Sequence, residues 1–186
     1  MAAAATDENP FQVLGLEPSY ALAQEALRNA LLRESLRWHP DRWVTRVAAE
    51  RRAAEDRMAA VNHAYTALAD PIGRAEALLA QAGAPMPRGT DHVSCPGALL
   101  AMMELKEELA DGRAAGDPAR MKAAAQNLAE QEQSSLAELA AAFASWEAAG
   151  MPTEKARELH ARLAEATYLR RTATGLAAET VVIAEM

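Results

Sequence analysis

The strongest hydrophobic pattern in the chain is a stripe of apolar positions in its first half. These positions recur at spacings of 4, 3, 4 and 3 residues, so they line one side of a helix and should form core. The stripe consists of Ala54, Met58, Val61, Tyr65 and Leu68. Asp70-Pro71 then places a capping carboxylate before a proline at the first helical position, which predicts a new helix to about Gln81.

Two earlier segments are also predicted to be helical. Residues 10–14 suit one short turn, 15–20 a connection, and a longer helix should run from about residue 22 to 37. On this longer helix Leu27, Leu31 and Trp38 share a face. Glu34 occupies the middle of that face, where an apolar residue would pack better, so either it lies at the rim or the face is assigned wrongly.

The second half of the chain carries three further helical segments. One is predicted from Leu99 to Leu109, ending near Gly112, and Asp117-Pro118 repeats the cap followed by proline. Residues 119–149 hold no glycine or proline, and their apolar positions fall mostly on one face. That face consists of Met121, Leu128, Leu136, Leu139, Phe143 and Trp146.

After a break at Gly150 and Pro152, Thr153 is placed to cap a last helix. The stripe of that helix consists of Leu159, Leu163 and Ala166. Three helices of this kind pack most simply as an antiparallel three-helix bundle.

Composition supports a wholly helical protein of two small domains. The hydrophobic fraction of 51% depends heavily on alanine and aromatic residues make up only 4%, which favours helices packed through small side chains over a sheet. Glycine and proline crowd into residues 83–97, which predicts a linker. The expected fold is all-α, with an N-terminal domain over 1–82 and a C-terminal helical bundle over 98–186.

Charge and cysteine content exclude several function classes. A net charge of -7 does not suit a nucleic-acid binder, although the eight arginines of residues 28–57 outnumber five carboxylates and form a locally basic region. The single cysteine, Cys95, excludes a disulfide framework, and with His92 it offers too few ligands for zinc. We therefore expect protein partners, with no metal and no cofactor.

The chain start and hydropathy predict a cytoplasmic protein. Residues 1–8 lack the features of a signal or transit peptide, and no stretch approaches the roughly 20 apolar residues that cross a bilayer. A lone cysteine also suits a reducing compartment. No contact with a membrane is expected.

The polar residues with the clearest functional pattern are His39-Pro40-Asp41. Proline lacks an amide donor and biases the preceding residue away from helical angles, so His39 should end its helix and project, with Asp41, into a loop. An enzyme site is disfavoured, because neither a third partner nor a nucleophile is signalled nearby.

This tripeptide after a basic helix resembles the signature of the J-domain family. Three further segments stand in that family's order and spacing: Phe11–Leu16, Asn62–Tyr65 and Asp70-Pro71. The resemblance implies docking on a DnaK-family chaperone and stimulation of its ATPase. The implied chaperone-binding residues are His39, Pro40, Asp41, Arg33, Arg37 and Arg42.

Elementary geometry is compatible with that role for the arginines. Arg33 and Arg37 are one helical turn apart and point to the same side, where they can meet an acidic surface, and Asp41 can pair with a partner arginine. The alternative is that these arginines form an ordinary solvated helix face.

The second half resembles HscB, the J-domain co-chaperone of iron–sulfur cluster assembly. The similarity lies in Leu99–Leu109, in Arg74–Leu79 and in Gly15-Leu16 with Tyr20 and Leu22, so it covers nearly the whole chain. It implies an IscU-type scaffold as client and an HscA-type chaperone as ATPase. The implied scaffold-binding residues are Leu99, Leu100, Met103, Glu104 and Glu107.

The alternative is that the predicted helix from Leu99 to Leu109 contributes only to the core of the bundle. We expect a split, with Leu105 and Leu109 inward and Leu100 and Met103 at least partly outward. For a further aromatic contact that the family often has in its last helix, Tyr168 is the nearest candidate. Three rivals remain: a J-protein with another client, a helical module with an inactive J-domain, and an enzyme.

Overall fold

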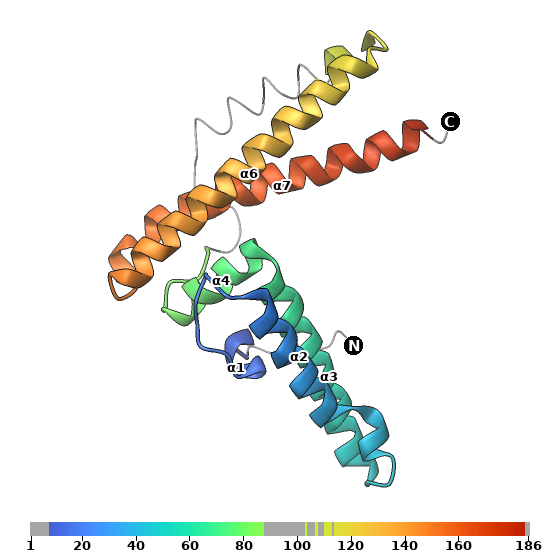
Figure 1. The fold of residues 1–186 in the computed structure, drawn as a ribbon, viewed down its shortest axis with the longest axis vertical. Helices are drawn as coiled ribbons and strands as arrows, with labels where there is room; N and C mark the ends of the chain where they lie inside the picture. Colours follow the sequence, from blue (N-terminus) through green and yellow to red (C-terminus); the bar gives the residue numbers. More distant parts are fainter. Residues whose placement is uncertain (1–7, 88–102, 104–106, 108–109, 113, 185–186) are drawn as a thin grey trace. The chain divides into compact units, whose positions relative to one another are not determined.

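The chain folds into two compact helical units. The computed structural model describes residues 8–87, 103, 107, 110–112 and 114–184, and its two units are Met1–Met86 and Pro87–Met186. Within the described residues every regular element is a helix, which confirms the all-α prediction (Figure 1). The predicted linker at 83–97 lies mostly outside them, so its role stays a prediction.

The first unit is built on a hairpin of two long helices. Its elements are α1 (Pro10–Leu14), α2 (Gln24–Trp38), the 3-10 helix η1 (Pro40–Trp43), α3 (Ala48–Ala69) and α4 (Pro71–Gln81). Figure 1 shows α2 and α3 side by side, with α1 close to both. The core stripe of α3 is confirmed, because Ala54, Val61 and Leu68 are buried, while Met58 and Tyr65 are partly exposed.

Caps and one arginine hold α4 against the rest of this unit. The Asp70 carboxylate accepts the amide of Gly73 at 3.0 Å, which confirms the predicted helix start. Arg74 donates to the carbonyl oxygens of Leu68 at 2.8 Å and Tyr20 at 2.7 Å. Burial lowers the pKa of Arg74, although nearby Tyr20 and Asp70 act in the opposite direction. The guanidinium thus joins α4 to the end of α3 and to the connection before α2.

The second unit is dominated by two long antiparallel helices, α6 (Pro118–Ala148) and α7 (Ala156–Ala184). Both stripes predicted for these helices supply core. Its fully or almost fully buried side chains include Leu128, Leu139, Phe143, Trp146, Leu159, Leu163 and Ala166. Phe143 and Trp146 meet edge to face with ring centroids 5.7 Å apart, a favoured aromatic geometry.

One predicted helix start in this unit is wrong, whereas the predicted helix end near Gly112 holds to within two residues. Gly112 and Ala114 are both helical, and the glycine with positive φ that follows them is Gly116, at 61°. The amide of Asp117 donates back to the Gly112 carbonyl at 2.9 Å, as in a Schellman motif. The preceding described residues 103, 107 and 110–112 are helical as well.

Thr153 does not cap α7. It is the first residue of a 3-10 turn, η2 (Thr153–Lys155), whose N-cap is Pro152. The indole N–H of Trp146 donates to the Pro152 carbonyl at 2.9 Å, which supports the chain reversal one residue before Thr153. No helix among the described residues combines the length and the hydropathy needed to cross a membrane.

Candidate docking sites

The His39-Pro40-Asp41 tripeptide lies where α2 ends. His39 has φ −59° and ψ 130°, the extended angles expected before proline, and Pro40 begins η1. The side chains of His39 and Asp41 are 53% and 86% exposed. The predicted loop is therefore displayed to solvent, but as a 3-10 turn that the sequence pattern did not indicate.

A local hydrogen bond ties the imidazole of His39 to the turn. The Asp41 amide donates to His39 Nδ1 at 3.3 Å. The Asp41 carboxylate lies 3.6 Å from the same Nδ1. The loop thus presents an imidazole and an exposed carboxylate side by side.

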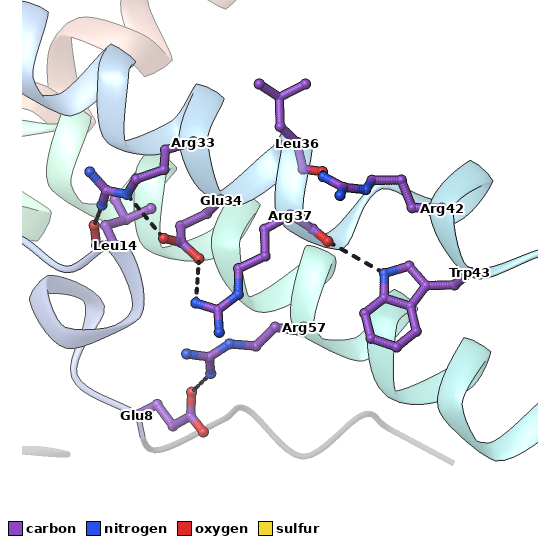
Figure 2. A network of polar contacts seen from close by, with 9 residues as sticks. All are labelled: Glu8, Leu14, Arg33, Glu34, Leu36, Arg37, Arg42, Trp43 and Arg57. Carbon is purple, nitrogen blue, oxygen red and sulfur yellow. Dashed lines mark hydrogen bonds and ion pairs between the residues drawn. The ribbon is translucent and has the colours of Figure 1, made fainter. Parts of the chain in front are cut away.

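Glu34 explains the anomaly on the face of α2. It is 9% exposed and is the buried charged residue of the described part of the chain. Its carboxylate lies 3.2 Å from Arg33 Nε and 3.9 Å from Arg37 Nη1 (Figure 2). The face was assigned correctly, and the carboxylate is tolerated because two guanidinium groups neutralise it.

The two arginines of α2 that are predicted for docking are not equivalent. Arg33 also donates from Nη2 to the carbonyl of Leu14, the last residue of α1, next to Gly15 at φ 60°. A Cβ at Gly15 would lie 3.2 Å from the same Arg33 nitrogen, so the guanidinium packs tightly on this turn. Arg37 is 67% exposed and holds Glu34 only at long range. Arg33 is therefore part of the fold, and Arg37 is the more available of the two.

Side chains of η1 return to the end of α2. Figure 2 shows Arg42 donating from Nη1 to the Leu36 carbonyl at 2.9 Å and the Trp43 indole donating to the Arg37 carbonyl at 3.4 Å. The rings of Trp38 and Trp43 stack at 5.5 Å with planes 10° apart, and the Arg37 guanidinium lies 5.1 Å from the Trp38 ring centroid. These contacts join η1 to the last turn of α2.

The second candidate surface is only partly described. Met103 is 62% exposed, Glu107 is exposed, and both residues are helical. Their spacing of four puts them on one side of the helix. Leu99, Leu100 and Glu104, and the predicted inward residues Leu105 and Leu109, lie outside the described residues. On α7 Tyr168 is 36% exposed.

Metal ligation finds no support in the part of the chain that the structure describes. None of its His, Cys, Asp and Glu side chains gather into a group of three that could hold an ion. His92 and Cys95 lie outside that part.

Known proteins resemble this chain in both sequence and fold. A family model described as the HSCB C-terminal oligomerisation domain matches residues 96–171. The co-chaperone HscB homologue of Bordetella pertussis is 38% identical over 116 residues, 62% of this chain and 67% of that protein. The homologue of Bordetella avium is 38% identical over 103 residues, which span 55% of this chain and only 61% of its own length.

Two solved structures extend the likeness beyond the aligned sequence. The chaperone HscB of Vibrio cholerae superimposes with a TM-score of 0.69 at 27% identity, covering 92% of this chain and 99% of that one. Human co-chaperone HscB, at 21% identity, shares the fold with a TM-score of 0.73, over 94% and 84% of the two chains. The expected architecture of a J-domain followed by a C-terminal helical bundle is thereby confirmed. On the similarity to these relatives, the chain belongs to the HscB co-chaperone family.

Proposed function

We propose that this protein is a non-enzymatic adaptor of iron–sulfur cluster assembly in the cytoplasm. Its first unit docks on an HscA-type chaperone of the DnaK family and stimulates ATP hydrolysis by that chaperone. Its second unit binds an IscU-type scaffold protein and delivers it to the same chaperone. Coupling the two binding events on one chain promotes cluster transfer, because each raises the effective concentration of the other partner.

The observation that carries the chaperone half is the exposed tripeptide at the end of α2. His39 and Asp41 project to solvent from an ordered turn, and the Asp41 carboxylate is 86% exposed. A carboxylate presented in this way suits bidentate pairing with an arginine of the partner. Arg37 stands on the same helix end with its guanidinium accessible, which suits an acidic partner surface.

The proposed chaperone-binding set keeps all six residues of the sequence prediction but divides their work. Pro40 shapes the turn through its fixed φ, and Arg33 holds α1 against α2. Arg42 joins η1 to the Leu36 carbonyl, and His39, Asp41 and Arg37 make the contacts. An enzyme is disfavoured, since the turn that displays His39 and Asp41 contributes only proline, arginine and tryptophan besides them, and none of these is a nucleophile.

Exposure of the described residues supports the scaffold half. A methionine that is 62% exposed, one turn from an exposed carboxylate, combines an adaptable apolar contact with a charge for a basic rim. The proposed scaffold-binding surface comprises Leu99, Leu100, Met103, Glu104 and Glu107.

The chaperone half is tested by steady-state ATPase assays on an HscA-type chaperone. Wild type should stimulate hydrolysis, and His39→Gln should abolish stimulation while leaving helical circular dichroism unchanged. Wild type without any effect would identify an inactive J-domain instead.

The scaffold half is tested by calorimetric titration with an IscU-type scaffold. A Leu100→Ala, Met103→Ala double variant should lose binding, whereas Leu32→Ala, which removes a leucine 59% exposed in the first unit, should bind as wild type does. Stimulation of the chaperone without any scaffold binding would point to a J-protein with another client.

A further inference from the structure

The end of α2 leaves several backbone carbonyls without their helical partners, and those of Leu36 and Arg37 are two of them. The carbonyl of Leu36 would accept the amide of residue 40, which is proline and has none. The carbonyl of Arg37 would accept the amide of Asp41, which donates to His39 Nδ1 instead. The tripeptide that creates the docking loop therefore also leaves both of these carbonyls without a helical hydrogen bond.

Two side chains of η1 restore both bonds. Arg42 supplies a donor to Leu36 at 2.9 Å, and Trp43 supplies one to Arg37 at 3.4 Å, the second being the weaker because of its length (Figure 2). The stacking of Trp38 on Trp43 also holds η1 against the end of α2. Because η1 spans only Pro40–Trp43, these contacts leave little freedom to the backbone of His39 and Asp41.

We propose that Arg42 and Trp43 are positioning residues, which set the geometry of the His39-Pro40-Asp41 loop by capping the C-terminus of α2. Arg42 acts through the Leu36 carbonyl and not as a salt bridge to the chaperone. This inference rests on the proposed docking function and changes the role of one residue in it. Arg42 supports the shape of the loop and does not contact the chaperone. Losing a hydrogen bond from a charged donor costs enough to open a turn of four residues measurably.

The structural arm of the test is amide hydrogen exchange in the full-length protein. The Arg42 amide donates to the His39 carbonyl at 3.0 Å and the Asp41 amide to His39 Nδ1, so both report closure of the turn. Arg42→Ala should raise their exchange rates by about fivefold or more, the value expected for one lost hydrogen bond. The control is Arg46→Ala, which removes an equal charge from an exposed neighbour outside the cap. Equal exchange in wild type and Arg42→Ala would overturn the proposal.

Two tryptophan variants test the cap without changing the charge of the protein. Trp43→Phe and Trp38→Phe shrink the same ring stack, but only the first deletes a hydrogen bond, because the Trp38 indole N–H is buried without a partner among the described residues. Trp43→Phe should therefore raise exchange at the Asp41 and Arg42 amides more than Trp38→Phe does. The reverse order would contradict the capping role.

The functional arm separates positioning from a direct contact. Arg42→Ala should raise the concentration needed for half-maximal ATPase stimulation by about fivefold, with the maximal stimulation retained. The half-maximal concentration of Arg42→Ala is divided by that of wild type, and the same ratio for Arg46→Ala serves as the control for lost charge. The corrected ratio should be the same at low and high salt, because salt screens an intermolecular ion pair but not a hydrogen bond to a backbone carbonyl. A ratio that falls toward one at high salt would assign Arg42 to the chaperone contact. Should wild type fail to stimulate at all, the docking proposal fails, while the exchange rates still decide the cap.

Discussion

Arg33→Met should destabilise the first unit more than Arg37→Met, although the two arginines share a carboxylate. Arg33 lies 3.2 Å from Glu34 and also donates to the Leu14 carbonyl, whereas Arg37 only approaches Glu34 at 3.9 Å. Removing Arg33 leaves a carboxylate that is 9% exposed with one distant partner, and it frees the end of α1.

The magnitude follows from these contacts. A hydrogen bond to a charged group contributes about 1.5–3 kcal/mol, and the Arg33 side chain is 54% exposed, so water replaces part of the loss. We expect Arg33→Met to lower the free energy of unfolding by about 1–2 kcal/mol. Arg37→Met should cost about 0.5 kcal/mol or less, because its ion pair is long and solvated.

Hydrogen exchange at the amides of Val61 and Leu68 measures this free energy in the first unit alone, because both residues lie in the buried stripe of α3. Combining Arg33→Met with Glu34→Leu should recover most of the loss, since an apolar residue can replace a buried ion pair without penalty. Equal losses for the two arginine variants, or no recovery in the double variant, would refute the reasoning.

Three further predictions concern helix ends and core packing. Asp70→Ala should cost about 1 kcal/mol through loss of the α4 cap, whereas Thr153→Ala should change the midpoint of urea unfolding little, because the N-cap of η2 is Pro152 and not Thr153. Phe143→Ala should cost about 3–5 kcal/mol in the second unit by opening a cavity at a fully buried site, as urea unfolding followed by circular dichroism will show. Gly116→Ala should destabilise by about 1 kcal/mol at φ 61°, and Gly175→Ala, in open space on α7, should stabilise by about 0.5–1 kcal/mol; thermal melting gives both signs.

Local chemistry decided which parts of the fold could be predicted from the sequence. Asp70 and Asp117 cap helices through amides two or three residues away, so their role is legible in the sequence. Thr153 follows a proline instead of preceding one, and the N-cap of its turn is Pro152. The bond from the Trp146 indole to the Pro152 carbonyl supports this turn and leaves no periodic signal in the sequence.

The candidate docking site likewise has parts that the sequence predicts and parts that only the folded unit shows. The tripeptide was recognisable because a proline that follows a helical segment biases the preceding residue away from helical angles. Glu34 read as a misfit because its partner Arg33 is held by α1, which only the folded unit brings near. The carbonyls that Arg42 and Trp43 cap could have been found by asking which acceptors Pro40 leaves free, a question that needs no alignment.

The stacked pair of Trp38 and Trp43 gives the protein a built-in optical probe. The chain has three tryptophans, and two of them lie at the proposed docking loop, partly exposed and 5.5 Å apart, while Trp146 is buried in the second unit. Indole emission depends on solvent contact, so a partner that covers the loop should change the signal of the first unit without any attached label. In a Trp146→Phe background the remaining indole emission comes from Trp38 and Trp43, which flank His39 and Asp41, so association can be followed in real time at the loop.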